Sequence, residues 1–146
     1  IKHADIREII MPESIEKLEK RRTVLFAELA EVGDFRRGSI SSNYRKCGKK
    51  NCVCSTEGHL GHGPQYLWTT TRNGKSLAKK LTLGPELDKY KTETDEYRKF
   101  KNLCSEIIDI SEEICNIRPI YDIDDDEMEA LKKKLQYFFE KKSKKK

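Results

Sequence analysis

Three cysteines crowded into eight residues near the middle of the chain are the feature that most constrains its fold. They occupy the run 47–54 (C-G-K-K-N-C-V-C), and histidines follow at positions 59 and 62. Around them, residues 34–64 are rich in Gly, Ser, Asn and Cys and show neither a helical nor a strand period, so they are predicted to be loop. Any fold must therefore hold an irregular, cysteine-bearing segment between its regular elements.

The spacing C-x4-C-x-C-x7-H fits the ligand requirement of zinc. Zinc prefers a tetrahedron of four N or S ligands, and three cysteines with one histidine are an accepted set. Gly48 lets the chain turn around the first sulfur, and the neighbouring lysines and backbone amides favour thiolates over thiols. Either His62 or His59 can be the fourth ligand, and His62 is favoured because Gly63-Pro64 fixes the chain just before the next predicted strand. The predicted zinc ligands are Cys47, Cys52, Cys54 and His62.

Other interpretations of the cysteines stay open. Another thiophilic metal can use the same ligands, whereas a redox-active thiol cluster or a set of inert cysteines would need no metal. A four-thiolate iron–sulfur cluster would require Cys104, Cys115 or a second chain. The polar Gly-Lys-Lys-Asn stretch between the first two cysteines argues against a buried cysteine core.

The cysteine count and the apolar pattern both favour a cytoplasmic protein. Five cysteines is an odd number, which does not suit a secreted disulfide framework, and the cytosol keeps thiols reduced. The sequence has no apolar run of the ~20 residues that a membrane span needs, and residues 1–10 have no signal-peptide pattern. We therefore expect no membrane contact.

Residues 65–72 and 75–83 predict a β-hairpin. Asn73-Gly74 between them is a strong turn signal, because a type I′ turn needs positive φ at both central residues. A short strand is also expected near 39–42. The two-residue turn would place eight hairpin residues on one aromatic and basic face, in the pairs Arg72–Lys75, Thr70–Leu77, Trp68–Lys79 and Tyr66–Leu81.

Apolar stripes predict three helices. The first covers about 13–33, with Pro12 at its start and Arg22 as the one gap in its stripe. The second follows Gly84-Pro85 and carries an apolar a/d seam over 100–117. Acidic residues 124–126 offer an N-cap for a shorter third helix over 128–139.

These elements predict an α+β fold that is mainly α. We expect a long, antiparallel, coiled-coil-like helical hairpin that carries a small zinc-knuckle and β-hairpin insert, plus a short C-terminal helix. Only 36% of residues are apolar and 38% are charged, so neither long helix buries its stripe alone, and a homodimer through the helices is expected. The expected segments are the N-terminal helix (1–35), the basic metal-binding module (36–84), the long helix that pairs with the first (85–119), and the C-terminal helix with its basic tail (120–146).

Positive charge is confined to the middle third of the chain. Residues 36–80 hold ten Lys or Arg against one acidic residue, a net charge of +9, whereas residues 1–35 and 81–146 each have a net charge of −2. A basic block with interleaved aromatic residues indicates nucleic-acid contact, with DNA favoured over RNA and an acidic protein surface as the next choice. The predicted contacts are Arg36, Arg37, Arg45, Lys46, Lys49, Lys50, Tyr66, Trp68, Arg72, Lys75, Lys79 and Lys80.

The motif resembles the core of an uncharacterised prokaryotic family of small proteins. Its pattern is YRxCGKxxCxC, then HGPxY, then GK, and here it runs from Tyr44 through Cys54 and His62 to Lys75. In that family the core lies between two helices, and the genes are often found among mobile elements. The similarity covers about residues 35–118, and it implies that the three cysteines and His62 act as one group.

Taken together, the patterns indicate a zinc-stabilised nucleic-acid-binding protein, and the resemblance implies that it is an accessory protein of a mobile element. No nucleophile–base pair, glycine-rich phosphate loop or spaced carboxylate set is present in the sequence, so we do not expect an enzyme. Two alternatives stay open. In one, the helices dock a larger enzyme as a protein-interaction module. In the other, the cysteines act as a redox sensor.

Overall fold

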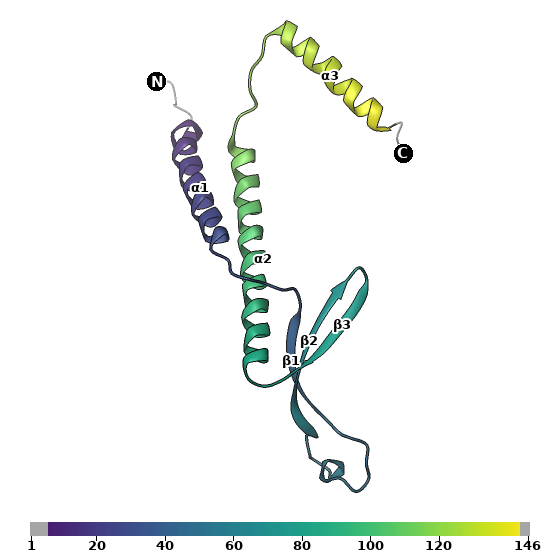
Figure 1. Cartoon of the computed structure of the whole chain (residues 1–146). Helices are drawn as coiled ribbons and strands as arrows, with labels where there is room; N and C mark the ends of the chain where they lie inside the picture. The colour runs from purple at the N-terminus through teal and green to yellow at the C-terminus, as the bar shows by residue number, and fades with distance from the viewer. Residues whose placement is uncertain (1–5, 144–146) are drawn as a thin grey trace. The chain divides into compact units, whose positions relative to one another are not determined.

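The computed structural model describes residues 6–143, with side chains from residue 15 onward. The chain divides into two compact units, residues 1–114 and residues 115–146. Among the described helices, none combines the length and the apolar content needed to cross a membrane. The elements follow in the order α1 (Ile6–Ala30), β1 (Ser39–Arg45), β2 (His62–Arg72), β3 (Lys75–Leu81), α2 (Pro85–Ile117) and α3 (Asp125–Ser143) (Figure 1).

The three strands form one antiparallel sheet with β2 in the centre. The predicted register of the β2–β3 hairpin is confirmed at all four of its pairs. The turn has φ values of 50° at Asn73 and 73° at Gly74, as a type I′ turn requires. β1 is longer than the predicted strand at 39–42 and pairs along the other edge of β2.

One face of the sheet packs against the N-terminal half of α2. The Trp68 ring meets the Tyr90 ring edge-on, with 5.5 Å between centroids. Lys79 Nζ lies 2.6 Å from Glu86 Oε1, and this contact is the main reason that the pKa of Glu86 falls to about 2. The aromatic and basic face that the hairpin pattern predicts therefore exists, but it is directed toward α2.

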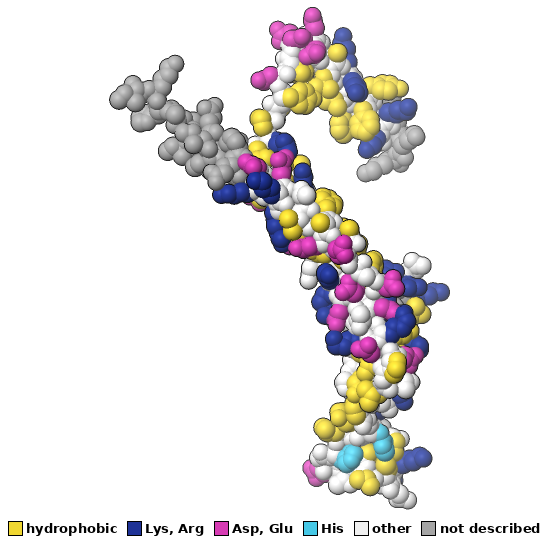
Figure 2. Space-filling view, turned by 60° about the vertical axis from the view of Figure 1, so that its left-hand side comes forward, with side chains coloured by type: hydrophobic (Ala, Val, Ile, Leu, Met, Phe, Trp, Pro, Cys, Tyr) yellow, Lys and Arg dark blue, Asp and Glu magenta, His cyan; other side chains and the backbone are white. Residues whose placement is uncertain are grey.

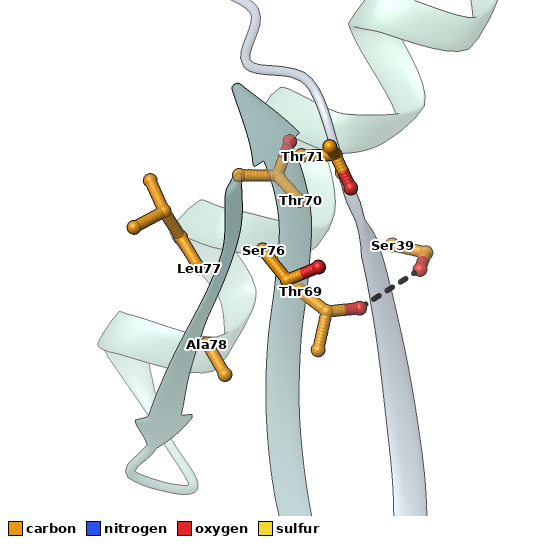
Figure 3. A pocket seen from close by; sticks show the side chains of 8 residues that line it. Ser39, Thr69, Thr70, Thr71, Ser76, Leu77 and Ala78 are labelled. Carbon is orange, nitrogen blue, oxygen red and sulfur yellow. Dashed lines mark hydrogen bonds between the residues drawn. The ribbon is translucent and has the colours of Figure 1, made fainter. Parts of the chain in front are cut away.

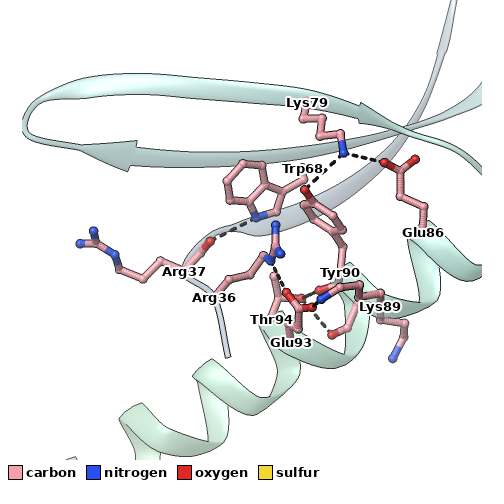
Figure 4. A network of polar contacts seen from close by, with 10 residues as sticks. Arg36, Arg37, Trp68, Lys79, Glu86, Lys89, Tyr90, Glu93 and Thr94 are labelled. Carbon is pink, nitrogen blue, oxygen red and sulfur yellow. Dashed lines mark hydrogen bonds and ion pairs between the residues drawn. The ribbon is translucent and has the colours of Figure 1, made fainter. Parts of the chain in front are cut away.

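Arg36, just before β1, ties the sheet to α2 (Figure 4). Its guanidinium lies 3.7 Å from the centroid of the Tyr90 ring and forms an ion pair with Glu93. Glu93 is 7% exposed and also pairs with Lys89, and Lys89 and Arg36 together hold its pKa below the ordinary value despite burial. The backbone N–H of Arg36 donates to the backbone oxygen of Glu93 (3.1 Å). Arg36 therefore links the segment before β1 to α2 through both its side chain and its backbone. These two elements lie far apart in the sequence.

A small apolar cluster joins α1 to the C-terminal half of α2. The predicted stripes of the two helices meet there, and an ion pair between Arg21 Nη2 and Glu106 Oε1 (2.7 Å) also links the two helices. The removal of these apolar side chains from water stabilises the packing of α1 against α2. Its buried members are Leu25, Leu103 and Ile107, with Leu29, Val32 and Ile110 packed against them.

α3 is the regular element of the second unit. The backbone N–H of Glu127 donates to Asp124 Oδ1 (2.8 Å), so the predicted N-cap is confirmed. No described residue of α3 is buried, and Tyr137, Phe138 and Phe139 are exposed. Hydrophobic side chains gather on the surface of this C-terminal part of the chain (yellow in Figure 2).

The expected long helical hairpin, with its zinc-knuckle and β-hairpin insert and a short C-terminal helix, is wrong. Among the described residues, the apolar cluster joins α1 to the C-terminal half of α2, whereas the N-terminal half of α2 packs on the sheet. The sheet has three strands, and the fold is α+β with three helices. α3 has 19 residues, because a Lys-, Glu- and Leu-rich segment sustains helix propensity well beyond 139. The first helix begins at Ile6 rather than near residue 13.

Candidate metal centre

β1 and β2 bring the two ends of the cysteine loop together. Arg45 pairs with His62 at one end of the sheet, after a register irregularity between Asn43 and Arg45. Residues 46–61 form the loop that leaves and returns at this pair (Figure 1). Cys47 lies just beyond β1 and His62 is the first residue of β2, so strand pairing places the first and last predicted ligands side by side.

The four predicted ligands form one cluster. The sulfurs of Cys47, Cys52 and Cys54 and a ring nitrogen of His62 all lie within 4.8 Å of one another. Cys47 Sγ is 3.4 Å from Cys54 Sγ, and Cys52 Sγ is 3.2 Å from His62 Nε2. Around a tetrahedral zinc ion, bonds of ~2.3 Å to sulfur and ~2.0 Å to nitrogen would separate neighbouring ligand atoms by roughly 3.5–3.8 Å. The cluster could therefore bind a metal ion with shifts of about 1 Å or less.

Hydrogen bonds within the loop hold the sulfurs in place. The Cys47 N–H donates to Cys54 Sγ (3.4 Å), and the Ser55 hydroxyl donates to the backbone oxygen of Cys52 (2.6 Å). A single 3₁₀ turn, Val53–Ser55, carries Cys54 inward, where it is 1% exposed. The loop thus presents its ligands through its own backbone geometry.

The structure distinguishes the two candidate histidines. His59 Nδ1 accepts a hydrogen bond from the Gly61 N–H (2.9 Å), which commits one of its ring nitrogens to the local turn. His62 is the histidine that joins the three sulfurs, and His59 is outside the cluster. The preference for His62 agrees with this placement.

The surroundings of Cys47 favour its thiolate. The backbone N–H of Lys49, with the imidazole of His62 and the thiol of Cys54, lowers the pKa of Cys47 to about 6. At Cys54, the Cys47 N–H lowers the pKa, but burial and the neighbouring thiols outweigh it and leave the pKa above its ordinary value. Because metals bind thiolates, Cys47 is prepared as a ligand at neutral pH.

Gly61 allows the returning loop to pass close to β1. Its φ is 108°, and an added Cβ would lie 2.6 Å from the carbonyl carbon of Arg45. Gly58 also has positive φ, 82°, but nothing lies within 4 Å of its Cβ position. Both glycines have positive φ, but only Gly61 has other atoms close to its Cβ position. Comparing the same substitution at the two positions therefore separates the cost of backbone strain from the cost of steric contact.

We expect Gly61→Ala to push the loop away from β1 and to weaken zinc binding about tenfold or more, the range seen when groups that orient metal ligands are lost. Gly58→Ala should cost only the strain of positive φ, about 1 kcal/mol, with zinc affinity nearly unchanged. Competition for zinc against a chromophoric chelator measures both variants. Equal losses of affinity in the two variants would contradict this account of Gly61.

The predicted nucleic-acid contacts fall into two groups. The first lies between the sheet and α2 and consists of Arg36, Tyr66, Trp68 and Lys79. The second is exposed and consists of Arg37, Arg45, Lys46, Lys49, Lys50, Arg72, Lys75 and Lys80.

The Trp68 ring of the first group is engaged inside the protein. The Trp68 indole N–H donates to the backbone oxygen of Arg37 (3.1 Å). Tyr66 lines a depression between the sheet and α2, together with Leu87. The Trp68 ring therefore supports the packing of α2, and its position does not suit a stacking platform for bases, whereas that role of Tyr66 stays a prediction.

The sequence pattern did not identify the residues that shape the site without binding metal. Gly61 and Ser55 position the loop. Tyr90 and Glu93 contact Arg36, just before β1, and so help to hold the sheet whose strands β1 and β2 flank the loop. Glycines on both sides of His62 were a usable signal for a close backbone approach. No local pattern marks Tyr90 or Glu93, because Arg36, the partner that they share, comes from the segment before β1.

Comparison with known proteins places the chain in an uncharacterised family. The family model described as a domain of unknown function (DUF6788) matches residues 15–92. This match covers more than half of the chain and contains the whole sheet and the Cys/His cluster. No curated protein and no solved structure matches the chain. The chain therefore belongs to the DUF6788 family of domains of unknown function.

Proposed function

We propose that this protein is a zinc-stabilised nucleic-acid-binding protein that binds DNA. The observation that carries the proposal is that one loop holds both the metal ligands and a group of exposed lysines. The loop that groups the four metal ligands also holds Lys46, Lys49 and Lys50, all exposed, and no carboxylate of the described residues pairs with these lysines. A metal ion there would fix three positive charges on one small surface, which is what phosphate contacts require.

The proposed role of the zinc ion is structural. Cys47, Cys52, Cys54 and His62 would fill all four positions of a tetrahedral ion and leave none for a substrate. The ion would hold the loop closed, and the protein would act without catalysis. The chain resembles a protein family whose genes are often found among mobile elements. We therefore extend the proposal to an accessory role on the DNA of such an element.

Neutralising the loop lysines tests this function. The triple change Lys46→Gln, Lys49→Gln and Lys50→Gln is expected to weaken binding to a short DNA duplex, because it removes phosphate contacts. Each lost contact should lower the slope of log K against log salt concentration by about 0.9, or up to about 2.7 for three. Fluorescence anisotropy at salt concentrations from about 50 to about 200 mM measures the slope.

A triple change on α3 is the control. Lys132→Gln, Lys133→Gln and Lys134→Gln remove the same charge from the second unit, and the affinity should change less than twofold. Binding that is absent or does not depend on salt would contradict the proposed function. Equal losses from the two triple variants would show that net charge alone governs binding and would contradict a contact at the metal loop.

A further inference from the structure

We propose that the uncovered face of the sheet enters the major groove of double-stranded DNA. The inference rests on the proposed function and deepens it, because it names the contact surface and the form of the nucleic acid. The two faces of the sheet differ sharply in what they touch.

Cross-strand partners point to the same side of a sheet, so the register assigns every strand residue to a face. α2 covers the face of Trp68 and Lys79. The opposite face carries the rows Ser41–Leu67–Lys80 and Ser39–Thr69–Ala78. A shallow depression of about 480 Å³ lies there, and only strand residues and Gly38 line it (Figure 3). This face is polar, built of small side chains, and open.

The charges around the open face are complementary to a polyanion. Lys80 lies on this face, and Arg37 is next to Gly38, which lines the depression. Arg72 and Lys75 belong to the opposite face and lie at the tip of the hairpin, at its turn. All four are exposed, and no carboxylate of the described residues pairs with them. Glu57, in the metal loop, is the only acidic residue in the segment 36–80. An acidic or phosphate-bearing surface fits this face, whereas an apolar partner would find little to bury.

The hairpin has the dimensions of a groove-binding ribbon. β1 pairs with β2 only as far as Thr69, so residues 70–77 form a two-stranded extension beyond the third strand. Two strands about 4.8 Å apart fit the DNA major groove, which is about 12 Å wide and admits a two-stranded ribbon. Thr71 and Ser76 are cross-strand partners on the open face of this extension. Their hydroxyls can bond to base edges, and the threonine methyl can contact thymine.

The same structure disfavours other nucleic acids. Single strands are held by stacking on exposed aromatic rings, but the Trp68 ring packs edge-on against Tyr90 of α2. The major groove of A-form RNA is too deep and narrow for side chains to read. Double-stranded DNA in the B form is therefore the partner that this face fits.

Chemical protection of DNA tests the proposal on the unaltered, zinc-loaded full chain. Dimethyl sulfate methylates guanine N7 in the major groove and adenine N3 in the minor groove. We expect bound protein to reduce methylation at guanine N7 several-fold over a short stretch of duplex and to leave adenine N3 unchanged. Protection at adenine N3 alone would overturn the assignment to the major groove.

The double change Thr71→Glu and Ser76→Glu tests the surface itself. The added carboxylates should weaken binding to a DNA duplex at least tenfold, with zinc affinity and thermal stability unchanged. Ser105→Glu, exposed on α2, adds a carboxylate elsewhere and should change the affinity less than twofold. If the double variant misfolds, the N7 protection experiment decides alone.

The outcomes separate this inference from the proposed function. Full binding by the double variant, combined with lost binding by the loop-lysine variant, would overturn the sheet contact and keep the function. Equal affinity for duplex RNA of the same sequence would also overturn it. Failure to bind any nucleic acid would overturn both.

Discussion

Replacing Cys54 with serine is expected to weaken zinc binding by more than ~100-fold, beyond the 10–100-fold that loss of an orienting group costs. Cys54 is the most buried ligand, and its sulfur accepts the Cys47 N–H within the loop. Structural zinc supplies about 10–16 kcal/mol to small zinc-dependent folds, so a loop without its ion should lose its order. Hydrogen exchange should then accelerate at the backbone amides of Cys47, Cys52 and Ser55, while the sheet pairs far from the loop stay protected.

Cys115→Ser is the control for this change. Cys115 is exposed on α2 and is outside the ligand cluster. The same substitution there should leave zinc affinity and loop exchange unchanged. Wild-type zinc affinity in Cys54→Ser would show that the four residues do not act as one metal site.

Removing the Arg36 side chain is expected to destabilise the first unit by about 2–3 kcal/mol. Arg36→Ala deletes a cation that lies over Tyr90 and pairs with the buried Glu93. Breaking a buried ion pair costs roughly 3–5 kcal/mol, and the loss is smaller here because Lys89 still pairs with Glu93. A change of this size lowers the midpoint of thermal unfolding by about 10 °C.

The neighbouring arginine is a control of the same type. The Arg37 side chain is exposed, and the contact it provides to Trp68 comes from its backbone oxygen, which alanine retains. Arg37→Ala should therefore shift the midpoint by less than about 2 °C, in line with other surface changes. Equal shifts in the two variants would contradict a structural role for the Arg36 side chain.

The pH dependence of stability tests the same ion pair between Arg36 and Glu93. The pKa of Glu93 is lowered from 4.5 in the folded protein, so its ion pairs stabilise the fold above that pH and are lost as the pH falls below it. Arg36→Ala removes part of this contribution. We expect the difference in unfolding free energy between wild type and variant to shrink in acid, as measured by urea unfolding at a series of pH values. A difference that does not change with pH would contradict the ion-pair explanation.

Local chemistry made part of this fold predictable. Asn73-Gly74 fixes a two-residue turn, and that turn fixes the register of every pair in the hairpin. The ligand spacing marked the Cys/His cluster in the same way, because the sulfurs come from one short loop. In both cases the residues that determine the structure are close together in the sequence.

Non-local contacts explain what the sequence did not predict. β1 is polar and has no clear alternation, so its full length and its pairing with β2 depend on the hairpin already present. The aromatic and basic face of the hairpin resembled a ligand surface because its partner residues, Tyr90 and Glu86, lie on a helix later in the chain. The apolar seam of α2 begins only near Phe100, which was a sign that the earlier half packs on something other than α1.

X-ray absorption at the zinc edge of the purified full chain tests the central claim most directly. The claim is that Cys47, Cys52, Cys54 and His62 hold one zinc ion and so fix the basic loop. The expected result is one zinc per chain, with three sulfurs at about 2.3 Å and one nitrogen at about 2.0 Å. Protein that contains no zinc, or zinc surrounded by oxygen ligands, would contradict it.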